Sequence, residues 1–241
     1  MTFGAEAERY FRAVHAADRS AVDGEPEAQL TTPVSNLFTA IAREAGLGTL
    51  QLVRETRTGR TRPDFGVLLT RDGATRQKGF IELKAPKITT NAPEWRGRNR
   101  TQWERMSVET EILVVCNGRE ARLFRDGTQI GAPAILPYDE PGTWDEQSLV
   151  DLLDRFCELP PNPVTDIADL TRRLAVRTRD LRDRIESLLQ DRSDPAALEA
   201  RGSYRLWQQH IYPAASQRDF ADGMAQVISY GMVLAALTPG E

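Results

Sequence analysis

The run ILVVC at residues 112–116 contains five apolar residues in succession, with no polar residue that could face water on either side. A strand of this kind is buried on both faces, so it lies inside a sheet that other elements cover from both sides. Neither this run nor the apolar residues 232–237 approach the ~20 residues of a membrane-spanning helix. The sequence therefore predicts an α/β fold and no membrane partner.

Patterns around this run predict a mixed central sheet flanked by helices. Apolar residues recur at helical spacing over residues 3–19 and again over 33–46, where Thr32 is a candidate N-cap and Pro33 takes the first helical position. Residues 86–100 have no period and are expected to form a loop that faces solvent or a ligand. Alternation and turn signals predict the remaining elements of this part: strands within 49–58, 62–73, 76–87 and 120–130, with turns at Asp72-Gly73 and Asp126-Gly127, and a short helix within 100–110.

Beyond residue 137 the composition shifts to turn residues and acids, and a proline-rich stretch follows at 160–163. We expect residues 1–140 to form one domain and residues 141–241 to form a helical connector region that starts with a short helix. Within the connector, residues 166–190 have the pattern of a long amphipathic helix. Apolar residues of the last segment align on one helical face, which we expect to be a core face: Phe220, Met224, Val227, Ile228, Gly231 and Leu234.

Cysteine and histidine are too scarce for several kinds of site. Cys116 and Cys157 have no CxxC spacing and no nearby histidine, which argues against a zinc site and against a disulfide framework. His15 and His210 have no evident partner for a histidine-based triad. The first residues, MTFGAEAERYFRA, lack the positive charge and apolar stretch of a signal peptide. We therefore expect a cytoplasmic protein.

Positive charge is concentrated in one part of an acidic chain. The net charge is −4, yet residues 54–105 contain 13 Lys or Arg and only 6 Asp or Glu. This distribution suits a local site for a polyanion, although a solvated Arg-rich surface would look the same. Lysine is clustered as well, because the chain has only three lysines, Lys78, Lys84 and Lys87. An ammonium group can be tuned at a reaction centre in a way that a guanidinium cannot.

The strongest chemical signal lies on the third predicted strand. Side chains alternate along a strand, so Glu82 and Lys84 lie side by side on one face. Asp64 opens the preceding strand, and antiparallel pairing through the Asp72-Gly73 turn would bring it back toward Glu82. The sequence therefore predicts that two carboxylates and one ammonium converge.

Two neighbouring carboxylates repel each other unless a cation lies between them, and oxygen ligands without His or Cys favour Mg²⁺ or Mn²⁺. We expect Asp64 and Glu82 to hold this metal, with the Leu83 carbonyl as a backbone ligand. Lys84 would orient a water molecule or offset charge on a phosphate. This chemistry is metal-assisted hydrolysis of a phosphodiester. The alternative is structural, since a Glu-x-Lys triplet can be an exposed ion pair and a Pro-Asp pair is common at turns.

The same residues carry a family resemblance. Arg62-Pro63-Asp64-Phe65 and the segment GFIELKAP at residues 79–86 resemble the signature of PD-(D/E)xK nucleases. The likeness is to the nuclease domain of restriction enzymes that carry nuclease and methyltransferase in one polypeptide. Glu27 lies where this superfamily often places a further acidic residue. Gln102 is similar to the first position of the QxxxY element of the Mrr-like branch, and the segment CNGREARLF at 116–124 resembles the strand, Asn-Gly turn and strand of that branch.

The sequence departs from the branch at Met106, where the QxxxY element has tyrosine. The resemblance implies a restriction-endonuclease-like fold and the catalytic residues Asp64, Glu82, Lys84, Gln102 and Glu27. It also implies DNA as substrate, Mg²⁺ or Mn²⁺ as cofactor, and a methyltransferase or specificity domain or subunit as partner. The chain would then act in restriction-modification or phage defence, either as part of a longer enzyme or by itself.

Arginines of residues 54–62 and 96–100 are candidates for contacts with DNA phosphates. Trp95 and Trp103 flank the basic loop and could stack on an unpaired base, although local packing is the commoner role of such aromatic residues. Two other functions are consistent with the sequence. One is a catalytically inactive nuclease-fold module that binds DNA or docks partners in a defence complex, and the other is a nuclease directed at RNA.

Overall fold

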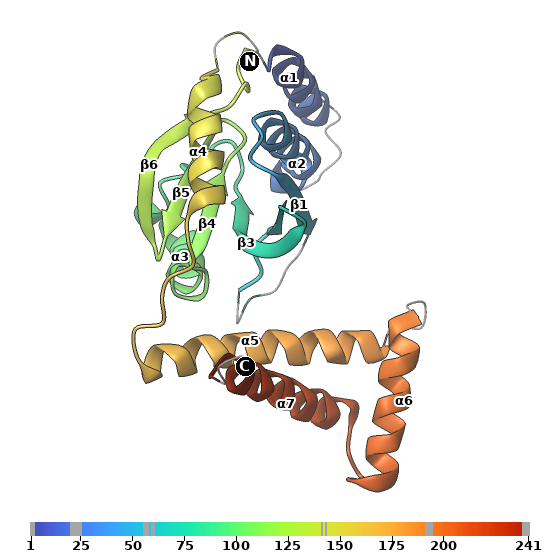
Figure 1. Cartoon of the computed structure of the whole chain (residues 1–241). Helices are drawn as coiled ribbons and strands as arrows, with labels where there is room; N and C mark the ends of the chain where they lie inside the picture. The colour runs from blue at the N-terminus through green and yellow to red at the C-terminus, as the bar shows by residue number, and fades with distance from the viewer. Residues whose placement is uncertain are drawn as a thin grey trace. The chain divides into compact units, whose positions relative to one another are not determined.

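The computed structural model describes residues 3–19, 26–54, 58, 61–140, 142, 144–190 and 195–237. Its contacts divide the chain into two compact units, residues 1–162 and 163–241. The first unit is built on one six-stranded sheet whose strands lie in the order in which they occur in the sequence (Figure 1). The strands are β1 (Thr49–Arg54), β2 (Phe65–Arg71), β3 (Ala74–Leu83), β4 (Ile112–Cys116), β5 (Glu120–Arg125) and β6 (Thr128–Ile135).

Helices cover both faces of this sheet (Figure 1). One face packs against α1 (Gly4–Arg19), α2 (Pro26–Glu44) and α4 (Glu146–Glu158), and the other packs against α3 (Gly97–Glu109) and the short 3-10 helix η1 (Ala92–Glu94). The strand β4 is buried along its whole length, as its apolar sequence predicts. The expected α/β fold is confirmed: a six-stranded mixed sheet flanked by helices, consistent with a restriction-endonuclease-like fold.

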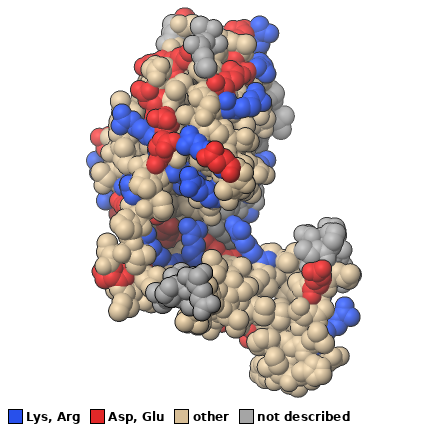
Figure 2. Space-filling model, viewed as in Figure 1, with Lys and Arg blue, Asp and Glu red and all other residues tan. Residues whose placement is uncertain are grey.

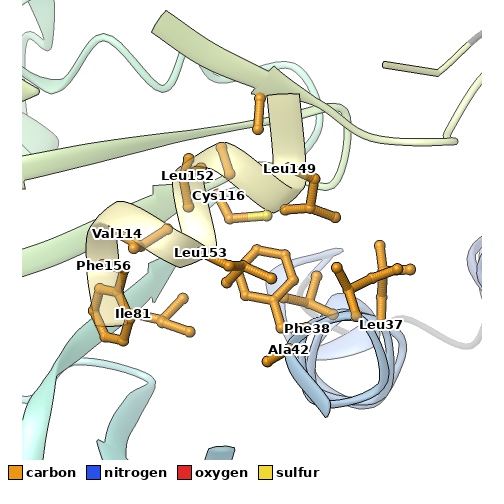
Figure 3. Packing of buried hydrophobic residues seen from close by; sticks show 14 of the residues in the cluster. Leu37, Phe38, Ala42, Ile81, Val114, Cys116, Leu149, Leu152, Leu153 and Phe156 are labelled. Atoms are coloured by element: carbon orange, nitrogen blue, oxygen red, sulfur yellow. The ribbon is translucent and has the colours of Figure 1, made fainter. Parts of the chain in front are cut away.

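The larger core lies between the sheet and helices α2 and α4. Figure 3 shows apolar side chains of α4 between the sheet and α2: Phe156 lies near Ile81 and Val114 of the sheet, and Leu153 lies toward Phe38 of α2. A smaller cluster on the opposite face contains Phe80, Trp95, Trp103, Leu113 and Phe124. Successive residues of β3 thus enter different cores, because side chains alternate across a strand.

The strand β3 has one antiparallel and one parallel neighbour, and these fix its position in the sheet. β3 pairs antiparallel with β2 but parallel with β4, whereas all other neighbours in the sheet are antiparallel. A parallel pair needs a crossover connection, and the chain makes it through η1 and α3. The crossover begins directly after Leu83, so Lys84 and the loop that follows it lie at the carboxyl end of β3.

Several predicted boundaries differ from the structure. β3 ends at Leu83 and not at Lys87, so Lys84 follows the strand directly and does not lie on it. α2 begins at Pro26 and not at Thr32, so Pro26 takes the first helical position and Pro33 lies inside the helix. The Asp126-Gly127 turn separates β5 from β6, so the predicted single interrupted strand is a hairpin of two strands. α3 begins at Gly97, inside the stretch that was expected to be a loop.

The second unit consists of α5 (Ile167–Gln190), α6 (Pro195–His210) and α7 (Gln217–Leu237). The long helix α5 matches its amphipathic pattern, whereas α6 was not predicted. The face expected to be buried on α7 is wrong in part, because Phe220 is buried but Val227, Ile228 and Leu234 are exposed. The helix packs instead through the small residues of another stripe, Ala221, Ala225 and Ser229.

This stripe brings α7 against α5, and the hydroxyl of Thr178 donates to that of Ser229 over 2.8 Å. Residues four apart share one helix face, and small side chains on it allow close approach of the helices. No described helix has the length and apolar character needed to cross a membrane.

Candidate functional site

The site forms where β2 begins and β3 ends. Phe65 pairs with Ile81, so Asp64, which directly precedes β2, lies next to Glu82. Glu82 enters the same side of the sheet as Phe80, while Ile81 and Leu83 enter the larger core. The antiparallel register and the strand period together bring the two carboxylates to one place, as the sequence predicts.

Asp64 is held in place by the backbone of the neighbouring strand. The N–H of Leu83 donates to its Oδ2 atom over 2.6 Å. Burial raises the pKa of Asp64, and the hydrogen bond from Leu83 and the positive charge of Lys84 oppose this shift. The carboxylate is thus oriented, half-buried and partly desolvated.

Glu82 and Lys84 form a buried ion pair, each with 3% of its surface exposed. The ammonium Nζ of Lys84 donates to Oε1 of Glu82 over 2.5 Å, and Nε2 of Gln102 donates to the same oxygen over 2.6 Å. Gln102 reaches this point from α3, within the crossover that follows β3. Charged side chains are rarely buried this deeply, and those that are buried are usually paired, as Glu82 and Lys84 are here.

The second oxygen of Glu82 has no hydrogen-bond partner in the part of the chain that the structure describes. Among the described residues, Glu82 Oε2 is the buried side-chain polar atom without a hydrogen bond. Burial raises the pKa of Glu82 to about 7, although Lys84 and Gln102 favour the charged form. Leaving a buried acceptor without a donor costs about 1–3 kcal/mol, so an unpaired oxygen here calls for an explanation such as an ion.

Glu27 completes the cluster from α2. Its Oε1 atom accepts a hydrogen bond from the N–H of Ala85 over 3.3 Å and lies 3.8 Å from Nζ of Lys84. All five residues predicted to be catalytic therefore lie within one connected group, although they come from four parts of the chain. The Leu83 carbonyl has no described contact that bears on its predicted role as a ligand, and the N–H of this residue serves Asp64.

The donor set suits a hard divalent cation. Asp64 and Glu82 supply carboxylate oxygens, and Glu82 Oε2 is free to accept a cation. Within the described part of the chain, no three His, Cys, Asp or Glu side chains gather in a way that could hold a metal ion. Two carboxylates are nevertheless sufficient for Mg²⁺, which usually retains several of its water ligands.

Some of the basic residues near the site are exposed, whereas others are engaged by neighbouring groups or lie outside the described residues. Lys87, Arg96 and Arg98 are exposed between β3 and the first turn of α3. Arg100 is already engaged by Glu104 and by the carbonyl of Pro93. Of the candidate arginines in residues 54–62, Arg54 and Arg62 are exposed, whereas Arg57 and Arg60 lie outside the described residues. On the face of the first unit that Figure 2 displays, basic and acidic side chains are interspersed.

The two tryptophans beside this region are buried, with 5% of Trp95 and 6% of Trp103 exposed. Their rings pack edge to face, and Trp103 makes the same contact with Phe124. Base stacking by these rings is therefore contradicted, because their faces are covered by protein. The sequence pattern missed another contact: the ring of Trp95 faces the Lys84 ammonium, with 5.4 Å between Nζ and the ring centroid.

No protein-family model and no curated protein sequence matches this chain. Among solved structures, a chain of the cryo-EM structure of the DrdV–DNA complex is similar to it, with a TM-score of 0.46 and 17% sequence identity. The similarity covers 95% of this chain and 21% of that chain.

Proposed function

We propose that this chain is a metal-dependent endonuclease that hydrolyses phosphodiester bonds in DNA, with Mg²⁺ or Mn²⁺ as its cofactor. One observation carries the proposal: two carboxylates and a buried ammonium meet at the end of β3, where Glu82 Oε2 has no hydrogen-bond partner among the described residues. An ion pair that only stabilises a protein surface does not need to be buried. A catalytic site, in contrast, uses burial and neighbouring charges to shift the pKa values of its groups.

Asp64, Glu82 and the Leu83 carbonyl are the groups that would hold the ion. When bound, such an ion polarises a phosphodiester oxygen. It also lowers the pKa of a water molecule bound to it, so that a nucleophile is available at neutral pH. Lys84 orients the attacking water through its ammonium and offsets negative charge that develops on the phosphate. Gln102 fixes Glu82, and the N–H of Leu83 fixes Asp64, so neither carboxylate has to be ordered when substrate arrives.

Arg96 and Arg98 are the described arginines that we assign to contacts with DNA phosphates. Such contacts supply affinity without base choice, and they weaken steeply as salt rises. We propose that target choice comes from a methyltransferase or specificity domain or subunit, in a restriction-modification or phage-defence protein. The resemblance of residues 62–65 and 79–86 to the nuclease signature supports this setting.

Cleavage of supercoiled plasmid by the purified chain tests the function. Asp64→Asn preserves shape and can still accept from the N–H of Leu83, but it removes the ligand charge, so we expect nicking to fall at least ~10²-fold. The matched control is Asp72→Asn, an exposed acid in the turn between β2 and β3, which should cleave like the wild type. Equal activity in Asp64→Asn and wild type would refute the proposal.

One observation favours a second function, a catalytically inactive module that binds DNA. Among the described residues, no group of three or more His, Cys, Asp or Glu side chains could hold a metal ion, and Glu82 already forms an ion pair with Lys84. This alternative predicts DNA binding that is indifferent to Mg²⁺ and no heat of Mg²⁺ binding in calorimetry. Binding of Mg²⁺ to wild type, lost in Asp64→Asn, would exclude it, and competition between DNA and RNA identifies the preferred substrate.

A further inference from the structure

We infer that Trp95 is a positioning residue for the ammonium of Lys84, held in place by the loop that follows β3. The inference deepens the proposed function and rests on it for its catalytic meaning. A lysine side chain has four rotatable bonds and a compact charge, so a catalytic lysine requires surroundings that restrict it.

The surroundings of Lys84 supply acceptors on one side and an aromatic face on the other. Oε1 of Glu82 accepts a hydrogen bond from Nζ, and Glu27 lies farther away at 3.8 Å. Asp64 interacts electrostatically with the same ammonium. The Trp95 ring covers the ammonium at 5.4 Å, within the range of cation–π attraction, and indole is the strongest aromatic partner for a cation.

The ring is itself fixed. Nε1 of Trp95 donates to the carbonyl of Thr89 over 2.6 Å, and its backbone N–H donates to the carbonyl of Ala92. The edge-to-face contact with Trp103 supports the ring from the α3 side. Since Trp95 is buried, the indole has little freedom to leave Lys84.

The loop that carries this indole is tied to the β4–β5 hairpin. The buried hydroxyl of Thr90 donates to Glu120 and accepts from Nε of Arg122 over 2.9 Å. The amide of Asn117 donates to the carbonyl of Ile88 over 2.8 Å. The loop is therefore a fixed strap that returns Trp95 to the site.

This arrangement has a consequence for the reaction. Glu82 contacts Lys84, Gln102 and the ion that we propose. When the ion binds, it draws negative charge from Glu82, so Glu82 accepts the hydrogen bond of the Lys84 ammonium less strongly. The aromatic face does not depend on the ion. Trp95 therefore keeps the ammonium aimed at the site while the charge on Glu82 is drawn elsewhere.

The scarcity of lysine makes the contact directly observable. Protein labelled with ¹³C at lysine Cε gives three Hε–Cε signals in NMR, from Lys78, Lys84 and Lys87. The face of an aromatic ring shifts nearby protons upfield, so the Lys84 signal, assigned by its loss in Lys84→Arg, should lie upfield and show an NOE to Trp95 ring protons. Trp95→Leu should remove the shift and lower kcat about tenfold with KM for DNA unchanged.

Two variants separate positioning from packing. Trp95→Phe retains an aromatic face and should restore most of the shift and of kcat. Phe124→Leu removes a buried ring from the same cluster, on β5, and should lower stability while leaving the Lys84 signal and kcat near wild type. An unshifted Lys84 signal without an NOE in the wild type would overturn the inference, as would equal kinetic losses in Trp95→Leu and Phe124→Leu. If the wild type shows the NOE but cleaves no DNA, the proposed function fails and the positioning contact stands.

Discussion

Glu82 and Lys84 place opposite charges where water hardly reaches them. Each ion loses hydration on burial, and the partner's charge offsets that loss. The structure therefore depends on both members being present. Apolar residues of similar volume would cost the fold less, which agrees with the catalytic role that we propose for this pair.

We expect Glu82→Gln and Lys84→Met each to lower the free energy of unfolding by about 3 kcal/mol, because either change leaves an uncompensated buried group. The double variant should lose clearly less than the sum of the two single losses. Urea unfolding in buffer free of divalent cations measures all three. Additive losses within about 0.5 kcal/mol would show that the two groups do not interact.

The sequence predicts Asp64, Glu82 and Lys84 because their meeting depends on only two regular features, the strand period and the hairpin register. Gln102 and Glu27 came from the resemblance and from no such rule. The contact of Trp95 with Lys84 could not be predicted, because it depends on the path of a loop without a period and on hydrogen bonds to Glu120 and Arg122.

Among the elements, the parallel pair β3 and β4 is the one that most closely restricts side-chain size. Gly79 approaches β4 and α4 so closely that a Cβ atom would lie 2.7 Å from the carbonyl oxygen of Ile112 and 3.0 Å from the ring of Phe156. The backbone of β4 cannot move away without loosening the strand that carries the site. Glycine is thus required here for lack of space and not for an unusual backbone angle.

We expect Gly79→Ala to lower the free energy of unfolding by about 1–3 kcal/mol through overpacking, and to reduce cleavage because β3 shifts. Gly4→Ala is the matched control, since a Cβ at Gly4 meets no atom within 4 Å. Chemical unfolding of both variants checks the expectation. A Gly79→Ala protein as stable as Gly4→Ala would contradict the close approach.

Elements with a strong pattern were predicted well, and those with competing signals were not. The Thr32-Pro33 pair has the chemistry of a helix start, yet the helix begins one proline earlier because tertiary packing outweighs local preference. α6 escaped prediction because the residues on its inward face, Ala197, Ala200, Tyr204 and Trp207, include no large aliphatic side chain, whereas Leu198 and Leu206 are exposed.

At the scale of the whole molecule, the two units are stabilised by different means. The first has two apolar cores around a sheet, whereas α5 to α7 bury few large side chains and leave many exposed. Polar contacts at helix starts therefore matter more in the second unit. Asp169 is the clearest case: it lies in the first turn of α5 and accepts hydrogen bonds from Arg173, Arg172 and the N–H of Thr165.

These contacts lower the pKa of Asp169 from 3.8 to about 2, with the hydrogen bond from Arg173 as the largest cause. A lowered pKa in the folded state stabilises the fold above pH 4, and this contribution is lost as the pH falls toward 2. We expect Asp169→Asn to unfold at a lower temperature than wild type at pH 6 and the difference to vanish near pH 2. Circular dichroism at 222 nm follows it, with Glu199→Gln on α6 as the exposed control, and a constant difference across this range would contradict the assignment.

The order of the strands along the sheet bears on how the protein is made. The ribosome releases Asp64, Glu82 and Lys84 before α3 and the β4–β5 hairpin, because these elements come later in the sequence. The strands lie in the sheet in the same order as in the sequence, so the sheet can be extended as the chain is made. A nascent chain that ends before Ile112 contains both acids, but it has neither β4, which pairs with β3, nor the β4–β5 hairpin that anchors the strap. Under the nuclease function that we propose, we therefore expect an incomplete polypeptide to cleave no DNA until β4 and β5 have been synthesised.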